Sequence, residues 1–501
     1  MLSFYQEWFA HPEWWFKATP EDDEYITQTF GYLLDNPPWN PHNVPETIEC
    51  ILVYDQLPRH VLRGTASHHI FRYYLQKALA FSSSLSKKLP LLSNEEWCFV
   101  MMPWRHTDEC FIISRLIQQA WKRYESRKSP TLQRFIKATY ERWPVQIQTP
   151  FMHIFLPTKY DPITFTRKHP IAEAFNKTID FHRKYVLSLS GGVDSMVCSV
   201  LLAQHIPPID YQVVHINYGN RETATEEEEF VKSWACTVLG KRLHVRRIHE
   251  IQRQKCMDNQ MRDTYESYTR NVRYACYRHM DPNTMVILGH NRDDCLENIF
   301  QNISHQTKYE NLRGMETLSV QDGISFLRPL LSIDKKDIIE FAKDHGIPNL
   351  PNSTPSWSMR GQIRNKIIPT MEEWNPSFVP NLFTLSDAMQ DLYQLANMYA
   401  DQFLRSLIQG GPSYSLNQST TKTTVRLTFS NSTTPVLDPQ HVPTSPMFWS
   451  IVLDKLYPDQ HISAKSIRMF VERLTSWLTT LTPMKTTFQV GKDTSIVGQV
   501  I

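Results

Sequence analysis

The stretch that most constrains the fold is Tyr-Val-Leu-Ser-Leu-Ser-Gly-Gly-Val-Asp-Ser at residues 185–195. Its first half is a short, β-rich apolar run, and the residues that follow it suit a helix. We therefore expect Ser190 to Ser195 to form the turn between a buried strand and a helix N-terminus. Gly191 and Gly192 have no Cβ, so an anion can approach the backbone there. The N–H groups of the first helical turn and the helix dipole then favour a phosphate.

Side chains in this turn add to the anion site. Ser190 and Ser195 supply hydroxyl donors, and Asp194 can hold a metal ion or orient a nucleophile beside the phosphates. Two glycines alone are equally compatible with a purely structural turn. The full Ser-Gly-Gly-x-Asp-Ser string is more specific, and it resembles the pyrophosphate-binding loop of the PP-loop ATP-pyrophosphatase superfamily, whose members split ATP to AMP and pyrophosphate. It is not a P-loop, because no Gly-Lys-Ser or Gly-Lys-Thr ends it.

The composition describes a soluble globular protein of two or three domains, with 501 residues, 41% hydrophobic and 21% charged. The net charge of +2 does not mark the whole surface as a nucleic-acid binder. Eight scattered cysteines without a Cys-x-x-Cys pair argue against structural zinc, a cysteine-held cluster and a disulfide scaffold. The chain has neither a signal-peptide pattern nor an apolar run of the ~20 residues that span a bilayer. We expect a cytoplasmic protein without a membrane anchor.

Residues 1–178 are expected to form an all-helical domain, because apolar residues recur at three- and four-residue spacing, as in residues 48–55, 69–75 and 110–121. No strand alternation competes with this pattern. The tryptophans of this region favour an aromatic core over a base-stacking role; they are Trp8, Trp14, Trp15, Trp39, Trp97 and Trp104.

Two strings in this region carry polar residues at set positions, Tyr-Asp-Gln-Leu-Pro-Arg-His-Val-Leu-Arg-Gly at 54–64 and Met-Pro-Trp-Arg-His-Thr-Asp-Glu at 102–109. With the opening residues they resemble a bacterial, all-helical, TPR-like family known only as domain of unknown function 924. The resemblance implies no activity. The side chains concerned either line a polar groove or are held in hydrogen bonds between helices; they are Asp55, Arg59, Arg63 and His106.

From about residue 180 the pattern changes to alternating strands and helices. We expect strands at 185–190, 211–217, 243–248 and 284–289, and helices at 195–204, 224–239, 258–280 and 293–304. This β-α-β-α order predicts an α/β domain with a parallel sheet, covered on both faces, whose ligands bind at the carboxyl ends of the strands. We assign it to residues 179–375.

A second cluster of polar residues follows the fourth expected strand, in Leu-Gly-His-Asn-Arg-Asp-Asp-Cys-Leu-Glu-Asn at 288–298. Asp294 and Glu297 lie three residues apart, on one face of the expected helix, and Asp293 precedes them. These acids either cap the helix or bind Mg²⁺ or a substrate amine. Their position after a phosphate loop favours binding.

Residues 185–372 resemble the catalytic domain of the tRNA(Ile)-lysidine synthases. The family pattern Gly-His-His-x-Asp-Asp-Gln-x-Glu-Thr, followed by Gly-Met, fits 289–297 and 314–315. The strings at 214–221, 270–274, 328–331 and 360–364 also match. The sequence departs from the family pattern at several positions, namely Asn291 for histidine, Cys295 for glutamine, Gly361 for asparagine, and residues 305–308 and 352–355.

After residue 375 the sheet pattern stops. We expect a long amphipathic helix at 382–407, a strand at 424–429, two helices at 448–456 and 464–474, and two strands at 486–490 and 495–501. Residues 376–501 would thus be a helical linker and a small α+β domain, similar in outline to the accessory region with which lysidine synthases hold tRNA.

The resemblance implies a ligase that uses ATP, Mg²⁺ and free L-lysine to convert the wobble cytidine of a tRNA(Ile) with a CAU anticodon into lysidine. The implied catalytic residues are Asp194, Asp293, Asp294 and Glu297, with Asp194 and Asp294 as metal ligands. The implied ATP-binding residues are Ser190, Gly191, Gly192, Val193, Asp194, Ser195, His215 and His290. The candidates for tRNA contact are Arg221, Arg270, Arg273, Arg360 and Arg364.

Three alternatives remain. tRNA thiolation would need persulfide or cluster cysteines, which the scattered thiols do not suggest. Amidation of a small acid would leave the Arg-rich segment at 360–364 and the C-terminal domain without a purpose. A non-enzymatic tRNA-binding protein with a decayed catalytic domain would fit the departures at 291, 295 and 305–308. For the N-terminal domain we expect a contact with the tRNA body or with a protein partner.

Overall fold

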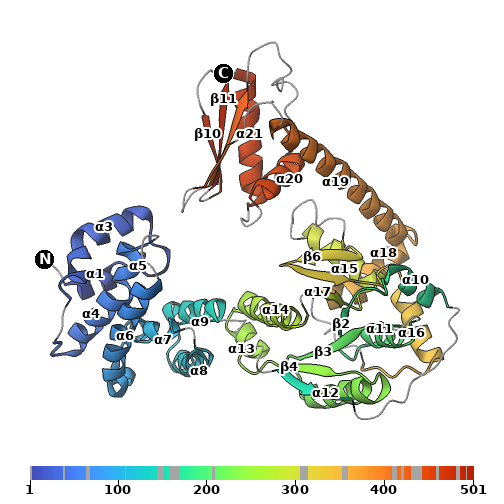
Figure 1. Cartoon of the computed structure of the whole chain (residues 1–501), viewed down its shortest axis with the longest axis horizontal. Helices are drawn as coiled ribbons and strands as arrows, with labels where there is room; N and C mark the ends of the chain where they lie inside the picture. Colours follow the sequence, from blue (N-terminus) through green and yellow to red (C-terminus); the bar gives the residue numbers. More distant parts are fainter. Residues whose placement is uncertain are drawn as a thin grey trace. The chain divides into compact units, whose positions relative to one another are not determined.

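The structure is a computed structural model of the 501-residue chain (Figure 1). It describes residues 3–37, 40–63, 68–107, 109–143, 152–157, 169–205, 209–281, 283–304, 314–351, 359–408, 415–418, 423–429, 443–457, 462–480, 486–491 and 494–500. None of the described helices combines the length and the hydropathy that a membrane span requires.

The chain forms two compact units. The first comprises residues 1–163, 182–190 and 209–286, and the second comprises 164–181, 191–208 and 287–501. The dividing points differ from the domain boundaries that we expect at 178 and 375, which stay a prediction.

The N-terminal region is helical, and its helices begin at residues that suit a helix start. Ser93 caps α7 in a reciprocal pair with Glu96, and proline opens α3 and α9. The helices of this region are α1 (Phe4–Ala10), α2 (Trp14–Lys17), α3 (Pro20–Phe30), η1 (Gly31–Leu34), α4 (Val44–Asp55), α5 (Leu57–Val61), α6 (His68–Ser84), η2 (Ser86–Leu91), α7 (Asn94–Arg105), α8 (Cys110–Ser126) and α9 (Pro130–Arg142).

Aromatic residues fill the core of these helices, as expected. Trp8, Trp14 and Trp97 are buried, and the Trp8 ring meets the Phe99 ring edge-on at 5.5 Å. Trp15 and Trp104 are half-buried, and Trp39 lies outside the described residues. The aromatic side chains therefore hold the helices together.

The polar residues of the two N-terminal strings bond between helices. His106, at the end of α7, hydrogen-bonds through Nδ1 to Asp55 Oδ1 at 2.8 Å, and both side chains are buried. Arg59 Nη2 lies 3.5 Å from the same carboxylate, and Arg63 pairs with Asp23. The sequence left open whether these side chains line a polar groove or are held in hydrogen bonds between helices. For Asp55 and His106 the second interpretation is confirmed.

The sheet of the α/β region has seven strands in the order β1-β4-β3-β2-β5-β7-β6. The pairs β2/β3 and β3/β4 are parallel, as expected, whereas β1/β4 and β6/β7 are antiparallel. The sheet is therefore mixed but mostly parallel. Its strands are β1 (Met152–Phe155), β2 (Tyr185–Ser188), β3 (Tyr211–Asn217), β4 (Leu243–Arg247), β5 (Met285–Ile287), β6 (Leu318–Gln321) and β7 (Ile324–Leu327).

Strand β1 corrects our expectation for residues 1–178, which was helix without competing strands. Two of its four residues are exposed and two are partly buried, and they form a strand because they pair with β4, which places β1 at the edge of the sheet. The helices between the strands lie close to the expected ranges; they are α10 (Pro170–Thr178), α11 (Val193–Ala203), α12 (Ala224–Ser233), the π-helical turn η4 (Trp234–Val238), α13 (Arg253–Asp258), α14 (Arg262–His279), α15 (Arg292–Ser304) and α16 (Lys335–Asp344).

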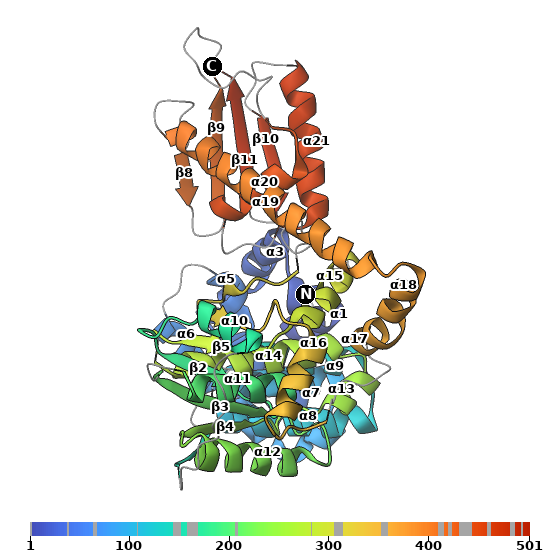
Figure 2. The same ribbon diagram turned by 90° about the vertical axis from the view of Figure 1, so that its right-hand side faces the viewer.

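The C-terminal part is helical, and short strands accompany the helices (Figure 2). The helices are α17 (Met359–Gln362), the π-helical turn η6 (Ile363–Ile367), α18 (Ile368–Trp374), α19 (Phe378–Ile408), α20 (Pro446–Leu456) and α21 (Ala464–Thr480). The strands β8 (Ser415–Gln418), β9 (Thr423–Phe429), β10 (Thr486–Gly491) and β11 (Thr494–Val500) form a sheet in the order β10-β11-β9-β8.

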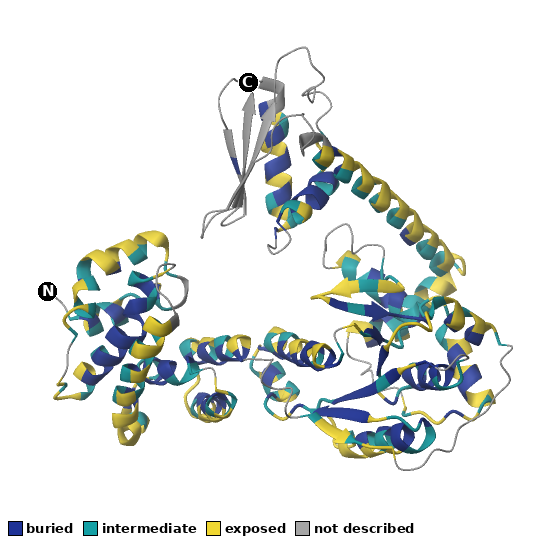
Figure 3. Ribbon diagram, in the orientation of Figure 1, coloured by how far each residue is buried: buried dark blue, intermediate teal, exposed yellow. Residues whose placement is uncertain are grey.

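This C-terminal part has a hydrophobic core of its own. Trp449 of α20 packs against Phe403 of α19 and Phe470 of α21, and all three are buried. Figure 3 shows that the buried residues of α21 gather on one side of the helix, whereas α19 is largely exposed along its length. In α20, residues 448–453 are all buried. The helices after residue 378 thus meet at a small core.

Candidate active site

The pyrophosphate loop follows β2 directly. Gly191 has a φ of +85°, which a residue with a side chain rarely adopts, and its carbonyl accepts from the Leu350 amide at 2.9 Å. Gly192 is the N-cap of α11, and Ser195 Oγ donates to the Gly192 carbonyl at 2.9 Å. The chain therefore turns from a buried strand into a helix at the glycines, as the sequence predicts.

Gly289, which follows β5, lies against the start of α11. A Cβ at Gly289 would sit 2.8 Å from the backbone nitrogen of Ser195 and 3.1 Å from Cβ of Asp194, closer than side chains tolerate. Only glycine permits this approach. It brings the polar cluster at the start of α15 next to the loop.

Asn291 joins the loop to α15. Its Nδ2 donates to Asp194 Oδ1 at 3.0 Å, and its Oδ1 accepts from the Asp294 amide at 3.1 Å. The Asn291 amide in turn donates to Asp294 Oδ2 at 3.1 Å, so the two residues cap the helix reciprocally. Asn291 is 1% exposed. From the sequence, Asn291 is only a departure from the family pattern, and these contacts could not be read from it.

Lys335, the first residue of α16, was also missed. Its Nζ forms an ion pair with Asp194 Oδ2, and its backbone amide donates to Asp293 Oδ1 at 3.3 Å. The available signal was its position, since it opens a helix shortly after the matched string at 328–331. Asp194 thus has an amide on one oxygen and an ammonium on the other.

Glu297 lies one turn deeper in α15 and is 0% exposed. Arg364 donates to Glu297 Oε1 through Nε at 2.7 Å and Nη2 at 2.6 Å. Arg360 Nε lies 3.8 Å from Glu297 Oε2, and Arg364 Nη2 lies 3.8 Å from Asp294 Oδ1. Burial raises the pKa of the Glu297 carboxyl, and Arg364 opposes that shift. Glu297 therefore anchors the arginine pair.

His290 and Arg328 form a neighbouring contact. Arg328 Nε donates to His290 Nδ1 at 3.2 Å, and its Nη1 donates to the Glu316 carbonyl at 2.8 Å and to Ser319 Oγ at 2.9 Å. Because Nδ1 accepts, a neutral His290 carries its proton on Nε2. The contact orients the ring next to the start of α15.

Cys295, which stands where the family has glutamine, packs under the Gly-Met pair. The Met315 amide donates to its sulfur at 3.4 Å, and a Cβ at Gly314 would lie 2.7 Å from that sulfur. Gly314 has a φ of +78°. The cysteine that replaces glutamine is therefore packed closely against the Gly314-Met315 turn. The departures at 305–308 and 352–355 lie outside the described residues.

The remaining site candidates belong to the first unit. His215 of β3 is buried, and its Nδ1 donates to the Leu189 carbonyl at 2.8 Å; burial lowers its pKa, so the ring stays neutral. Arg221 pairs with Glu227 at 2.8 Å. Arg270 of α14 is exposed, and Arg273 lies half-buried on the same helix.

The structure thus brings together in the second unit the predicted residues 191–195 of the loop and those of α15 and of the segment at 359–367, whereas Ser190 belongs to the first unit. Among the residues that the structure describes, no group of three or more His, Cys, Asp or Glu side chains forms a metal site. Asn291 links Asp194 and Asp294, which offer two carboxylates to a metal ion. Two carboxylates suit Mg²⁺, which commonly takes its other ligands from a substrate's phosphates and from water. The assignment of metal ligands stays a prediction.

Comparison with known proteins relates two regions of the chain to described families. Residues 165–371 match a PP-loop domain, and residues 4–149 match the family described as a bacterial protein of unknown function, DUF924. The tRNA(Ile)-lysidine synthase of Chlamydia muridarum is 29% identical over 244 residues, which cover 47% of this chain and 73% of that protein. The enzyme of Staphylococcus aureus strain MRSA252 is 28% identical over 239 residues, which cover 45% of this chain and 52% of that protein.

Among solved structures, the U34-tRNA thiolase NcsA from Methanococcus maripaludis gives a TM-score of 0.36 at 16% identity, covering 44% of this chain and 78% of that one. A similarity this low carries no argument. The PP-loop match implies that the chain binds ATP. The protein therefore carries a PP-loop ATP-pyrophosphatase domain related to those of the tRNA(Ile)-lysidine synthases, preceded by a DUF924 region.

Proposed function

We propose that the protein is a tRNA(Ile)-lysidine synthase-like ligase. The observation that carries the proposal is the network in the second unit in which Asn291 links Asp194 of the loop to Asp294 of α15, while Arg364 contacts both Asp294 and Glu297. One side of this network suits a triphosphate, and the other offers acids for an amine and cations for an RNA backbone.

In the first step, the C2 oxygen of the wobble cytidine attacks the α-phosphorus of ATP, and the bond from that phosphorus to the bridging oxygen breaks. Pyrophosphate leaves into the loop from Ser190 to Ser195, where the start of α11 favours its charge. Lys335 adds a cation beside Asp194. Asp194 and Asp294 are the residues that would hold Mg²⁺, which would neutralise charge on the phosphates.

In the second step, the ε-amine of free L-lysine attacks C2 of the adenylated cytidine, a C–N bond forms, and AMP leaves with the former C2 oxygen. The ammonium must first be held and lose a proton. Asp293 and Asp294 are the acids we assign to these tasks. Glu297 instead positions Arg364, because its Oε1 is already occupied by that guanidinium.

The tRNA needs cations along its backbone. We assign this contact to Arg360 and Arg364 at the site, and to Arg270, which is exposed on α14. The target base lies in the anticodon loop, where it is already unpaired, so that moving it into a pocket costs less than it would in a duplex.

The cysteines argue against thiolation. Seven of the eight are buried and Cys110 is half-buried. Burial raises the pKa of every one of these thiols. Since the thiolate is the reactive form, this set supplies poor persulfide carriers.

The decayed-enzyme alternative is disfavoured by the two described departures near the loop. Asn291 and Cys295 both make directed contacts inside the site. These contacts, with the ion pair of Asp194 and Lys335, give both altered positions a defined place in the site.

The test is ATP–pyrophosphate exchange with and without tRNA(Ile) and lysine, followed by mass spectrometry of the anticodon nucleosides. We expect tRNA-dependent exchange, AMP as the nucleotide product and a lysine adduct at the wobble cytidine. Asp194→Ala should reduce exchange about a hundredfold or more, whereas Asp344→Ala, at an exposed position of α16, should not. ADP as the product, or full activity of Asp194→Ala, would refute the proposal.

A further inference from the structure

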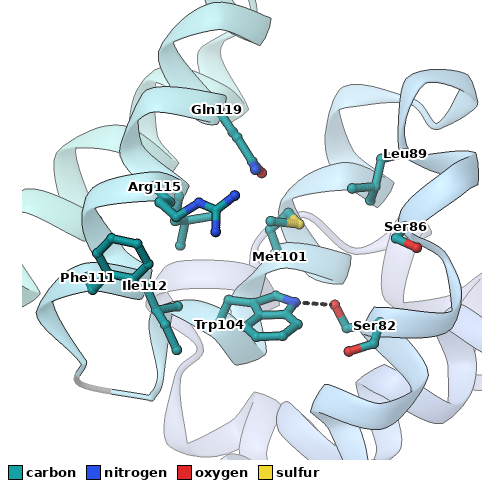
Figure 4. A pocket seen from close by; sticks show the side chains of 11 residues that line it. Ser82, Ser86, Leu89, Met101, Trp104, Phe111, Ile112, Arg115 and Gln119 are labelled. Atoms are coloured by element: carbon teal, nitrogen blue, oxygen red, sulfur yellow. Dashed lines mark hydrogen bonds between the residues drawn. The ribbon is translucent and has the colours of Figure 1, made fainter.

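A pocket of about 250 Å³ opens among helices of the DUF924 region, within the first unit (Figure 4). Its walls come from the end of α6, from η2, from α7 and from α8. The pocket is slightly smaller than the range of about 300–1,000 Å³ for drug-sized ligands, so it suits one planar group rather than an extended molecule.

The floor of the pocket is apolar and held in place. Met101 and Leu116 are buried. The indole of Trp104 donates its Nε1 proton to Ser82 Oγ at 2.7 Å, and Ser82 Oγ donates to the Val100 carbonyl at 2.6 Å. Because the indole donor is already used, Trp104 offers a ligand only its ring, in a fixed orientation.

The mouth carries an aromatic ring and a cation on the same helix. Phe111 is 72% exposed, and the guanidinium carbon of Arg115 lies 5.7 Å from the centre of its ring. Gln119 follows one turn later. Figure 4 shows Phe111, Arg115 and Gln119 along one wall, with Leu89 and Ser86 on the opposite side.

The surroundings of the pocket favour an anion. No carboxylate occurs among its described lining residues. Lys87 and Lys88 directly follow the lining residue Ser86, Lys122 lies one turn beyond Gln119, and all three lysines are exposed. A ligand with a flat apolar part and a negative group next to it would meet complementary chemistry.

We propose that this pocket binds one unstacked nucleotide of the tRNA. The base lies on the apolar floor between Trp104 and Phe111, the Gln119 amide faces its polar edge, and the adjoining phosphate meets Arg115. Stacking on aromatic rings accepts any base, and arginine contributes to it as well. The inference rests on the proposed function, which makes a tRNA the substrate.

An acidic peptide with an aromatic side chain is the other ligand with matching chemistry. Two features favour RNA. Gln119 supplies both a donor and an acceptor, which a base edge uses and a benzene ring does not. The same compact unit also presents Arg270 on α14, so that a polyanion can engage more than one of its cations.

The test measures tRNA(Ile) affinity of the full chain by fluorescence anisotropy at several salt concentrations. Phe111→Ala should weaken binding at least about fivefold, and Arg115→Gln should weaken it and reduce the salt slope by about one. The matched controls are Tyr73→Ala and Lys77→Gln on α6, since Tyr73 is 53% exposed with Lys77 Nζ 5.8 Å from its ring. Their affinities should stay within about twofold of the original protein.

Ser86→Phe is a second kind of test variant, because it blocks the pocket by adding a ring. Ser86 is exposed, so the new ring fills the mouth of the pocket and removes no packing. Circular dichroism checks that each variant is folded. Equal tRNA affinity of Phe111→Ala, Arg115→Gln and the controls would overturn the inference. So would the finding that the protein binds no RNA, or that the pocket binds an acidic peptide and not RNA.

The proposed function is judged separately, by nucleoside analysis with the unchanged protein. Lysidine formation with pocket variants that bind tRNA normally would remove the pocket proposal alone. Pocket-dependent tRNA binding without any lysidine would instead remove the proposed reaction and support the nucleotide site.

Discussion

Replacing Asn291 should separate two roles that its buried amide combines. Nδ2 donates to Asp194 in the loop helix, and Oδ1 accepts from the Asp294 amide at the start of α15. Asn291→Ala removes both contacts. Asn291→Ser retains a hydroxyl that can cap the helix but is too short to reach Asp194, so the two variants report the cap and the bridge separately.

The expected magnitudes follow from these contacts. A helix cap contributes about 0.5–2 kcal/mol, and a hydrogen bond to a charged group contributes about 1.5–3 kcal/mol. Because Asn291 is 1% exposed, water does not replace the lost contacts in the folded protein. Asn291→Ala should therefore cost about 2–5 kcal/mol of local stability and Asn291→Ser about 1.5–3 kcal/mol. The lower bound for alanine corresponds to about 30-fold faster amide exchange.

Hydrogen exchange followed by mass spectrometry is the suitable assay, because a chain of several domains does not unfold in one step. Peptides covering α11 and α15 report the local effect, and calorimetry reports ATP affinity. Asn43→Ala is the control: Asn43 caps α4 by accepting from the Glu46 amide at 2.9 Å, with no link to the loop. Equal exchange in Asn291→Ala and Asn291→Ser would refute the cap, because both variants lack the bridge. Exchange at the original rate in Asn291→Ser would refute the bridge.

Three further predictions concern other positions. Gly289→Ala places a Cβ 2.8 Å from a backbone nitrogen of α11 and should weaken ATP binding in calorimetry at least about tenfold, whereas Gly31→Ala, with its nearest contact at 3.8 Å, should not. Burial lowers the pKa of His106 to about 4, so the unfolded chain takes up a proton first. The free energy of unfolding should then fall by up to about 3 kcal/mol as the pH drops from about 6.5 to about 4, which thermal unfolding measures. An equally steep loss in His106→Asn would contradict this prediction. Because burial raises the thiol pKa values, iodoacetamide at neutral pH should modify the folded chain slowly and reach the half-buried Cys110 first; rapid labelling of several thiols would be inconsistent with the structure.

The parallel core of the sheet could be predicted because β2 and β5 are short, buried and largely apolar, and because helical stretches separate the strands. Strands β3 and β4 are also mostly buried but carry polar residues such as Gln212 and His244. The antiparallel strands could not be found by the same signal. The burial of β1 is partial, and this strand exists through its pairing with β4. The hairpin of β6 and β7 did carry a signal, the Asp322-Gly323 pair with φ values of +49° and +75°, which the sequence analysis overlooked.

The site divides in the same way. The loop glycines and the acids of α15 were named from the sequence because each belongs to a local pattern. Which groups pair across the site depends on the tertiary fold, so the contacts of Asp194 with Asn291 and Lys335 could not be foreseen. Glu297 and Arg364 were both named, but with different tasks, and the structure pairs them with each other.

The departures from the family pattern bear on whether the protein is an enzyme or a non-enzymatic protein with a decayed catalytic domain. Asn291 lies on the loop side of α15, and Cys295 follows one turn later, close to Gly314. A longer side chain at 295 would meet the Gly314 backbone, so the small residue and the tight turn depend on each other. Acids of the cluster remain matched by Lys335 and Arg364. Since unpaired buried charges are costly, this matching is maintained in any folded variant. Stability alone therefore accounts for the buried pair of Glu297, but not for Asp194 and Lys335, which are partly exposed beside a loop built for an anion. That pair is the part of the network that stability alone does not explain, and it favours a catalytic role.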